Sequence, residues 1–396
     1  MSLSFPTEVV TEGKTEVVVP KLETFVKEPS DYAPSKAPVF FNPVMELNRD
    51  LAVLALQAFQ GIVFRPLKVC EPLAGCGIRG IRMAREVDGV GSVVVNDINE
   101  DAFRLAKFNV EKNGLAGKVI VENKDANFLL SSFAAPRKRF DYVDIDPFGS
   151  PVPFVDSALR ATRRGGMLAL TATDLAPLCG VHPKACLRRY GGRPLRTGYC
   201  HELAVRLLAG ALATSAAKHD ISTKVVFSHS SEHYIRLYAL VDYGARKADA
   251  TLKNMGYVYH CFSCFHREAA AKAALNNKAT CPECGEKMDV AGPLWRGQIV
   301  NEDFVASMQR VAKTKSFKNK RKINKLLLLT REEATAPITY YAVDKICDKL
   351  GITVPPMNKV VTRLRKRRHE ARLTHFNTHG IKTDALAKTV KETIIA

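Results

Sequence analysis

Short runs of Val, Ile, Leu and Tyr alternate with segments of helical periodicity between residues 68 and 172. Each apolar run has the length of a buried strand, whereas segments 77–87 and 99–114 repeat apolar residues at the spacing of one helix face. This alternation predicts right-handed βαβ units, and therefore an α/β fold built on a parallel sheet. The strands are expected at residues 68–73, 92–97, 118–122, 140–146 and 166–172.

Two further apolar runs follow at residues 221–229 and 234–244, with only a few residues between them. So short a connection permits a hairpin, whereas a parallel crossover needs a dozen residues or more. The sheet is therefore predicted to end in an antiparallel edge.

The pattern changes after Gly244, where strand-like runs give way to a segment with cysteines and then to lysine-rich helical periodicity. A chain of 396 residues is also too long for one ordinary core. We therefore expect an N-terminal domain at residues 1–245 and a C-terminal domain at residues 246–396.

The second domain is predicted to contain three parts in succession. The cysteine segment spans residues 256–292, and one amphipathic helix is expected from Asn301 to Glu333. A helix, a turn at Gly351, a second helix and an extended piece then predict a winged helix-turn-helix at about residues 335–385.

The formal net charge is +19 and the isoelectric point is about 9.5. An excess of this size favours a polyanionic partner, with nucleic acid before a membrane surface. Lysine and arginine are concentrated at residues 313–325 and 363–376, which suits contact with phosphate backbones rather than with base sequence. The alternatives are a basic surface that only aids solubility and a solvated helix face.

A membrane role is not expected. The longest apolar stretches, at residues 51–59 and 203–213, fall short of the roughly 18 residues that a spanning helix needs. The first residues carry acids where a signal peptide has a basic flank and an apolar core. We therefore expect a cytoplasmic protein, and nothing in the sequence points to an obligate protein partner.

A glycine-rich loop, "CEPLAGCGIRG", joins the first predicted strand to the first predicted helix. Gly75 and Gly77 permit a tight turn and close approach of a ligand to the backbone. Asp97 ends the second strand, where a carboxylate can accept both ribose hydroxyls, and Asp125 with Ala126 follows the third strand, where they can bind adenine. These features describe an adenosine site, although the loop alone also fits NAD or a tight turn in an ordinary α/β fold.

The stretch "DYVDIDPFGSPVP" ends the fourth predicted strand at Asp146, Pro147 and Phe148. Chemistry in open α/β sheets lies beyond the carboxyl ends of the strands, which places Asp146 beside the cofactor. A carboxylate there can accept the hydrogen of a base amino group, and Phe148 offers a flat face for stacking. The alternative is that Asp146 caps the next helix and Phe148 packs beneath it.

These segments together resemble one family. The stretches "FFNPVMELNRD", "GIRGIR", "NDI", "DIDPFGSPVPFVDSAL" and "TATDLAPLCG" resemble, in order and across nearly the whole chain, the tRNA guanine-26 N2-dimethyltransferase family. The resemblance implies a class I, Rossmann-like methyltransferase fold, S-adenosylmethionine as methyl donor and the N2 of a tRNA guanine as acceptor. It assigns Arg49 and Arg79 to the cofactor, Asp97 to its ribose, Asp125 and Ala126 to its adenine, and Asp146 to catalysis.

Two other functions remain open at this point. One is a nucleic-acid-binding protein without activity on a Rossmann scaffold, and the other is a methyltransferase that acts on ribosomal RNA or DNA. In the glycine loop, Cys76 stands where the family usually has a small hydroxyl residue, so a side-chain contact at this position is not expected.

Four of the ten cysteines form two C-x-x-C pairs, Cys261 with Cys264 and Cys281 with Cys284. Their spacing is typical of a zinc ribbon, in which four thiolates surround one structural zinc ion and leave no open position. Redox or incidental cysteines are the alternative. The other cysteines considered are read as small packing residues, namely Cys70, Cys179, Cys186, Cys200 and Cys347.

Overall fold

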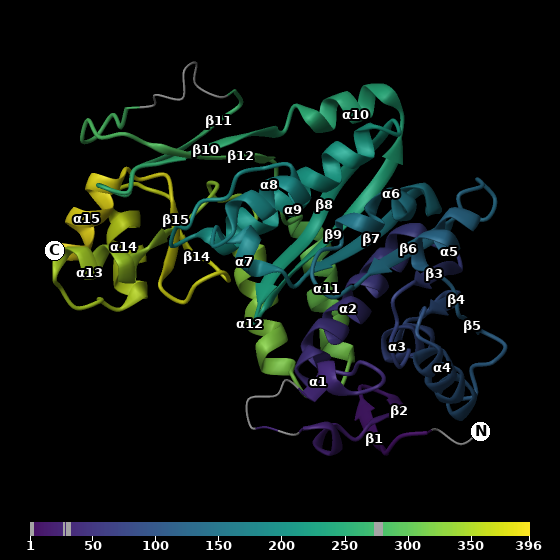
Figure 1. Ribbon diagram of the computed structural model, residues 1–396. Coiled ribbons are helices and arrows are strands. Elements are labelled where there is room, and N and C mark those ends of the chain that lie inside the picture. The colour runs from purple at the N-terminus through teal and green to yellow at the C-terminus, as the bar shows by residue number, and fades with distance from the viewer. Residues whose placement is uncertain (1–3, 27, 29–32, 273–279) are drawn as a thin grey trace.

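The computed structural model describes residues 4–26, 28, 33–272 and 280–396 (Figure 1). Its centre is a seven-stranded sheet with the strand order β5-β4-β3-β6-β7-β9-β8. The pairs from β5 to β7 are parallel, and β9 is antiparallel to both β7 and β8. The parallel sheet and its antiparallel edge are thus confirmed, and the α/β sheet is mixed. The strands are β3 (Leu67–Glu71), β4 (Val90–Asn96), β5 (Val119–Glu122), β6 (Phe140–Ile145), β7 (Thr162–Ala172), β8 (Ile221–Ser231) and β9 (Tyr234–Tyr243).

Local sequence signals begin and end the helices between these strands. The Asn99 side chain accepts hydrogen bonds from the backbone N–H groups of Asp101 (2.9 Å) and Ala102 (3.3 Å), which satisfies free donors of the first turn of α4. Gly114 follows the helix with φ +66°, a left-handed conformation that glycine adopts without strain. The helices of this part are α2 (Glu46–Val63), α3 (Ile78–Glu86), α4 (Glu100–Lys112), α5 (Ala126–Ser132), α6 (Val152–Ala161), α7 (Leu175–Leu178), α8 (Pro183–Tyr190), α9 (Cys200–Ala217) and α10 (Ala245–Leu252).

A hairpin that the sequence analysis did not predict precedes the sheet. It consists of β1 (Thr7–Glu12) and β2 (Thr15–Pro20), and short helical turns follow it. The Asn109 side chain of α4 exchanges hydrogen bonds with the backbone of Val18, so the hairpin is attached to the first sheet helices. The short turns are η1 (Leu22–Phe25), α1 (Ala33–Lys36) and η2 (Pro43–Met45).

A buried cluster of charged side chains fixes this hairpin against α2 and α3. Arg82 is fully buried, and its guanidinium donates to Glu86 (2.9 Å), Asp50 (2.7 Å) and Glu12 (3.2 Å). Arg49 also donates to Glu12, at 2.7 Å and 2.5 Å. Burial raises the pKa of Asp50 to about 6, although Arg82 opposes this increase. The negative charges of Glu12, Asp50 and Glu86 are therefore balanced by the two arginines, Arg49 and Arg82.

We expect Arg82→Met to lower the free energy of unfolding by about 3 to 5 kcal/mol, because it leaves buried carboxylates without their partner. Denaturation in urea, followed by circular dichroism, measures this loss. Arg85→Met is the matched control, since Arg85 lies on the exposed side of the same helix and contacts Asn113. Equal stability of the two variants would contradict a stabilising role for the cluster.

The cysteine segment forms a small antiparallel sheet with the order β11-β10-β12. Its strands are β10 (Met255–His260), β11 (Arg267–Ala270) and β12 (Asp289–Trp295). Residues 273–279 of the predicted segment 256–292 lie outside the described residues.

The prediction of one helix from Asn301 to Glu333 is wrong. The structure has two helices, α11 (Glu302–Thr314) and α12 (Lys320–Glu332), with a break between them. In the break Phe317 is buried below the Arg82 guanidinium, whose central carbon lies 5.5 Å from the ring centroid. The Nζ of Lys318 donates to the backbone oxygen of Thr11 (2.8 Å). The helix thus breaks where its residues pack against the N-terminal hairpin and α3.

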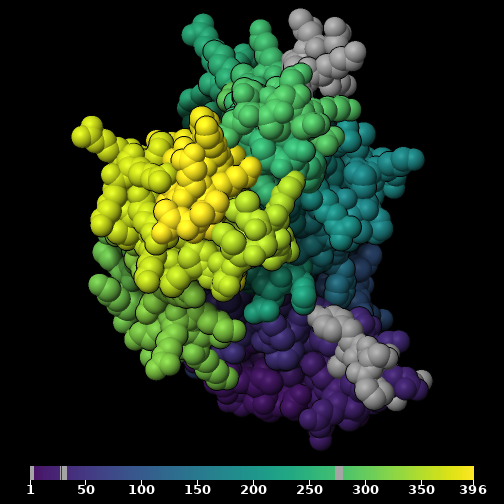
Figure 2. Space-filling view, turned by 90° about the vertical axis from the view of Figure 1, so that its left-hand side faces the viewer, coloured from purple at the N-terminus to yellow at the C-terminus, as the bar shows by residue number. Residues whose placement is uncertain are grey.

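The C-terminal residues form a compact unit of short strands and helices (Figure 1). Both predicted helices around Gly351 are present, and Gly351 ends the first of them with φ +66°. Figure 2 displays this part in yellow and yellow-green, to the left of and below the green cysteine segment. Its elements are β13 (Tyr341–Ala342), α13 (Val343–Leu350), α14 (Met357–Lys366), β14 (Ala371–Leu373), β15 (Gly380–Thr383) and α15 (Ala387–Ile395).

The hydrophobic interior of the described residues has more than one centre. The main cluster surrounds the seven-stranded sheet and continues through Trp295 and Phe304 to Leu327. A separate cluster lies between α13, α14 and α15 and includes Val343 and Val390. Within the described part of the chain, no helix combines the length and the apolar character needed to cross a membrane.

Candidate active site at the carboxyl edge of the sheet

The glycine loop after β3 adopts a backbone conformation that residues with a side chain rarely adopt. Gly75 and Gly77 have φ values of +54° and +78°, and a Cβ at Gly75 would lie 2.8 Å from the backbone oxygen of Phe40. The Gly75 N–H donates to Oδ2 of Asp97 (2.8 Å), whose Oδ1 accepts from the Asn99 N–H (2.9 Å). The loop and the end of β4 therefore hold each other in position.

Asp125 and Ala126 lie after β5, the next strand of the sheet. Asp125 caps α5, and its Oδ1 accepts from the Phe128 N–H (2.9 Å). Because β3, β4 and β5 are parallel neighbours, their following loops meet at one edge of the sheet. The structure thus brings the glycine loop, Asp97, Asp125 and Ala126 together on that edge.

The sequence analysis did not identify two apolar residues beside these positions. Ile98 directly follows Asp97 and is 66% exposed, and Phe128 lies in the first turn of α5 and is 65% exposed. Large apolar side chains that project from a polar edge commonly mark a binding surface. Their position next to two predicted ligand-binding acids is the signal that could have identified them.

Asp146 forms an ion pair with Arg79, which projects from α3. Nη1 of Arg79 also donates to Oδ1 of Asn48 (2.8 Å), and its Nε lies 3.4 Å from Oε1 of Glu71. Burial alone would lower the pKa of Arg79, but Asp144 and Asp146 outweigh this effect and raise it. Arg79 therefore remains a cation and holds the Asp146 carboxylate.

Two further carboxyl groups surround Arg79, but both are withdrawn from solvent. Asp144 receives hydrogen bonds from Arg236 (2.5 Å) and from the Tyr142 hydroxyl (2.7 Å). Burial alone would raise the pKa of Asp144, but Arg236 and Arg79 outweigh it and lower the pKa. Burial raises the pKa of Glu71 to about 8, against the influence of Arg79.

The carboxyl groups of Asp146, Asp144 and Glu71 differ in their solvent exposure. The Asp146 side chain is 16% exposed, compared with 0% for Asp144 and 4% for Glu71. Of the carboxyl groups that contact Arg79 in the described structure, Asp146 is thus the accessible one. A reacting group that approaches this edge of the sheet would meet Asp146.

The loop after Asp146 is tied to the end of β7. Gly149 donates to the Thr173 hydroxyl (2.7 Å), and the Thr173 N–H donates to the Gly149 oxygen (2.9 Å). The residue at the N-cap of α6 is Pro151, so Asp146 does not cap this helix. Phe148 is 69% exposed, and its ring meets the Phe40 ring edge-on at a centroid distance of 4.4 Å. The alternative of a capping aspartate above a packed phenylalanine is therefore excluded.

Arg49 lies apart from this arrangement. Its guanidinium is committed to Glu12 and to the backbone oxygen of Asn42 (3.1 Å). Asn48, which precedes it, contacts Arg79 instead. The two neighbours separate because successive residues point to different sides of a helix. The predicted contact of Arg49 with a cofactor is not tested by this geometry.

The four cysteines of the C-x-x-C pairs converge, with their sulfur atoms all within 4.8 Å of one another. The Sγ atoms of Cys261 and Cys284 are 3.5 Å apart, and those of Cys264 and Cys281 are 3.4 Å apart. Zinc–sulfur bonds of about 2.3 Å in a tetrahedron imply sulfur–sulfur distances of about 3.8 Å. The donor set and its spacing fit one tetrahedral zinc ion.

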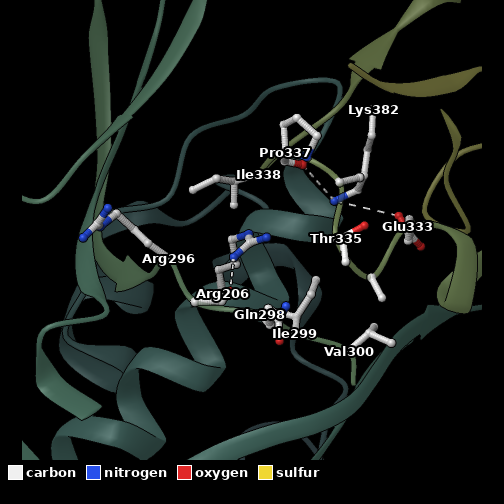
Figure 3. A pocket seen from close by; sticks show the side chains of 13 residues that line it. Arg206, Arg296, Gln298, Ile299, Val300, Glu333, Thr335, Pro337, Ile338 and Lys382 are labelled. Carbon is white, nitrogen blue, oxygen red and sulfur yellow. Dashed lines mark hydrogen bonds and ion pairs between the residues drawn. The ribbon is translucent and has the colours of Figure 1, made fainter. Parts of the chain in front are cut away.

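A cavity of about 300 Å³ lies where β15 approaches α9 (Figure 3). Nζ of Lys382 lies 2.8 Å from Glu202 and 3.8 Å from Glu333, and Arg206 lies 2.8 Å from Glu202. Burial alone would raise the pKa of Glu202, but Lys382 and Arg206 outweigh it and lower the pKa to about 2. The pair of Lys382 with Glu202 attaches β15 to α9, and no residue that lines the cavity is among the predicted site residues.

A mixed sheet with a glycine loop and with Asp97, Asp125 and the accessible Asp146 at its carboxyl edge is typical of an α/β protein that binds a nucleotide-like ligand there. The sequence model of the N2,N2-dimethylguanosine tRNA methyltransferase family matches residues 13–395. The chain belongs to this family.

Several related proteins align with this chain over nearly its full length. The chain is 44% identical over 387 residues to the tRNA (guanine(26)-N(2))-dimethyltransferase of Methanobrevibacter smithii, covering 98% of this chain and 97% of the relative. It is 35% identical to the tRNA (guanine(26)-N(2)/guanine(27)-N(2))-dimethyltransferase of Aquifex aeolicus, covering 95% and 93%. The solved structure of Trm1 from Pyrococcus horikoshii with S-adenosyl-L-methionine superposes with a TM-score of 0.84 at 36% identity, covering 98% and 99%.

Proposed function

We propose that this chain transfers methyl groups from S-adenosylmethionine to the exocyclic N2 of guanine 26 in tRNA, giving N2-methylguanosine and N2,N2-dimethylguanosine. One observation carries the chemistry: Asp146 is the accessible carboxylate at the carboxyl edge of the sheet, and a buried arginine holds it. The names of full-length relatives supply the substrate and the position. The fold is the class I, Rossmann-like methyltransferase sheet that this family implies.

The loops at the sheet edge suit S-adenosylmethionine. Each oxygen of Asp97 accepts one backbone N–H and retains a lone pair, so both can accept from ribose hydroxyls. Asp125 and the Ala126 N–H can bind the adenine edge, between the exposed side chains of Ile98 and Phe128. The glycine loop leaves backbone N–H groups near the N-terminus of α3. When bound, S-adenosylmethionine supplies an electrophilic methyl group.

Asp146 acts on the guanine amino group. Its carboxylate accepts an amino hydrogen, which directs the nitrogen lone pair toward the donor, and takes up the proton as the bond forms. Arg79 orients Asp146 through their ion pair, while Asn48 and Glu71 fix the guanidinium. The family resemblance implied that Arg79 contacts the cofactor. The ion pair adds a second role, in which Arg79 positions Asp146.

Phe148 holds the base. Its exposed ring can stack on guanine, a contact worth roughly 1 to 3 kcal/mol that does not depend on base identity. Guanine 26 lies in folded RNA, so the nucleotide must leave its stack to reach Asp146.

The C-terminal half binds the tRNA. The cysteine segment is a zinc ribbon in which Cys261, Cys264, Cys281 and Cys284 hold a structural zinc ion. The helices around Gly351 and the strands β14 and β15 form a winged helix-turn-helix. Exposed Lys and Arg residues on α12 and at the C-terminal end of α14 supply the contacts to phosphates, for example Lys320, Lys325, Arg365 and Lys366.

Mass spectrometry of nucleosides tests this function. After incubation with S-adenosylmethionine and unmodified tRNA, we expect N2-methylguanosine followed by N2,N2-dimethylguanosine, and neither product from a tRNA with adenine at position 26. Methylation of ribosomal RNA or DNA in place of tRNA would favour the alternative substrates. If calorimetry detects no binding of S-adenosylmethionine, a nucleic-acid-binding protein without activity becomes the better description.

A further inference from the structure

A second group of metal-binding side chains lies at the junction of α7 and α9, outside the cysteine segment. It consists of Cys179, at the end of α7, and of Cys200 and His201, the first two residues of α9. One donor atom of each residue lies within 4.8 Å of the other two, the same limit that describes the four cysteines of the predicted zinc ribbon.

The backbone brings these residues together. Gly180 follows Cys179 with φ +91°, and a Cβ there would lie 2.8 Å from the Arg196 nitrogen and 2.9 Å from the Leu195 carbonyl carbon. Only a glycine lets the turn after α7 lie so close to the segment that leads into α9. The Cys200 N–H donates to the Thr197 oxygen (3.2 Å), which fixes the start of α9. The approach of the three donors is thus built into the main chain.

These cysteines differ from those that only fill the interior. Cys186 and Cys347 are completely buried, whereas Cys179, Cys200 and His201 are only partly buried. Packing alone therefore does not explain two thiols and an imidazole at one partly open point.

We propose that Cys179, Cys200 and His201 form a second zinc site. Two thiolates and one neutral imidazole are a zinc donor set, and zinc bonds of about 2.3 Å to sulfur and about 2.0 Å to nitrogen require donor separations of about 3.5 to 3.8 Å. Small side-chain movements within the observed 4.8 Å reach this geometry. A water molecule would complete the tetrahedron, because the three residues are only partly buried.

A zinc ion at this position would connect two helices near the active-site loop. Zinc would attach the end of α7 to the start of α9, and α7 begins next to Thr173, which exchanges two hydrogen bonds with Gly149. The same segment includes Asp174, which accepts from the Tyr190 hydroxyl (2.5 Å) and pairs with Arg189 (2.9 Å). A metal here would stiffen the segment that supports the loop after Asp146.

Metal content of the full-length chain tests the proposal. The protein is incubated with excess Zn²⁺ under reducing conditions, passed through a desalting column and analysed by inductively coupled plasma mass spectrometry. We expect about two zinc ions per chain, about one after Cys200→Ser or after Cys281→Ser, and almost none in the double variant. Cys347→Ala is the control for an unrelated buried thiol and should keep both ions.

Substitution by Co²⁺ provides a second measurement that does not depend on the ribbon variant. Removal of the second site by His201→Gln should lower the sulfur-to-cobalt absorption by about one third, because two of six metal–sulfur bonds are lost. One zinc ion in the wild-type protein that disappears in Cys281→Ser would overturn the proposal. Two ions that remain in folded Cys200→Ser and His201→Gln proteins would do the same.

Discussion

Asp146→Ala should methylate tRNA at least about 100-fold more slowly than the wild-type protein, the lower end of the contribution of a positioned base. The variant should still fold, because Arg79 keeps Glu71, Asp144 and Asn48 as neighbours. Affinity for S-adenosylmethionine and for tRNA should change little, since Asp97, Asp125 and the basic C-terminal half are unaltered. Single-turnover methylation, with calorimetry for the cofactor, measures these quantities.

Asp156→Ala is the matched control for this experiment. Asp156 lies on α6 with its side chain 59% exposed, and its partners are the half-buried Arg160 and His219. The same chemical change at this surface position should leave the single-turnover rate within about twofold, since surface substitutions have small effects. If Asp146→Ala keeps its turnover per folded molecule, Asp146 is not the base, whatever the result for Asp156.

Cys281→Ser should remove the zinc ion from the cysteine segment and unfold that segment. Binding of structural zinc contributes on the order of 10 kcal/mol in small metal-dependent units, and this segment has only a small apolar cluster of its own. We expect a lower melting temperature of the C-terminal half and weaker binding to tRNA, while affinity for S-adenosylmethionine stays nearly constant. Metal analysis, differential scanning calorimetry and calorimetric titration measure the three effects.

Ser263→Ala provides the comparison within the same segment. Ser263 is exposed between Cys261 and Cys264 and is not part of the sulfur cluster. Its replacement should preserve both zinc content and melting behaviour. A Cys281→Ser protein that contains no metal at this segment and has full stability would refute a structural zinc ion.

Local sequence patterns predicted much of the fold. The five parallel strands and the hairpin lie within a few residues of their expected positions, since apolar runs of strand length leave little choice in an α/β pattern. Within the segment 99–114, which periodicity assigns to a helix, Asn99 caps α4 and Gly114 follows its end, because capping depends on neighbours in the chain. The convergence of the two C-x-x-C pairs also follows from a spacing visible in the sequence.

The predicted site residues lie at the carboxyl edge of the sheet, whereas the contacts that they make with one another were not part of the prediction. The positions of Asp97, Asp125 and Asp146 follow from the ends of parallel strands, which meet at one edge in any such fold. The ion pair of Arg79 with Asp146 does not follow from any local pattern, since it joins α3 to the end of β6. The exposure of Asp146 and the burial of Asp144, only two residues apart, depend on where β6 leaves the sheet.

By itself the sequence indicated most strands and helices of the central sheet, its antiparallel edge, the family and the residues at the carboxyl edge, because each rests on periodicity or short motifs. The tertiary structure decided which distant segments meet. Phe317 breaks a helix that periodicity predicts, because its ring is buried below Arg82. Cys179 and Cys200 meet because Gly180 packs on the backbone before α9. Helical and strand periodicity indicate which face of a segment is buried, but not which partner covers that face. The partner depends on packing across the whole chain.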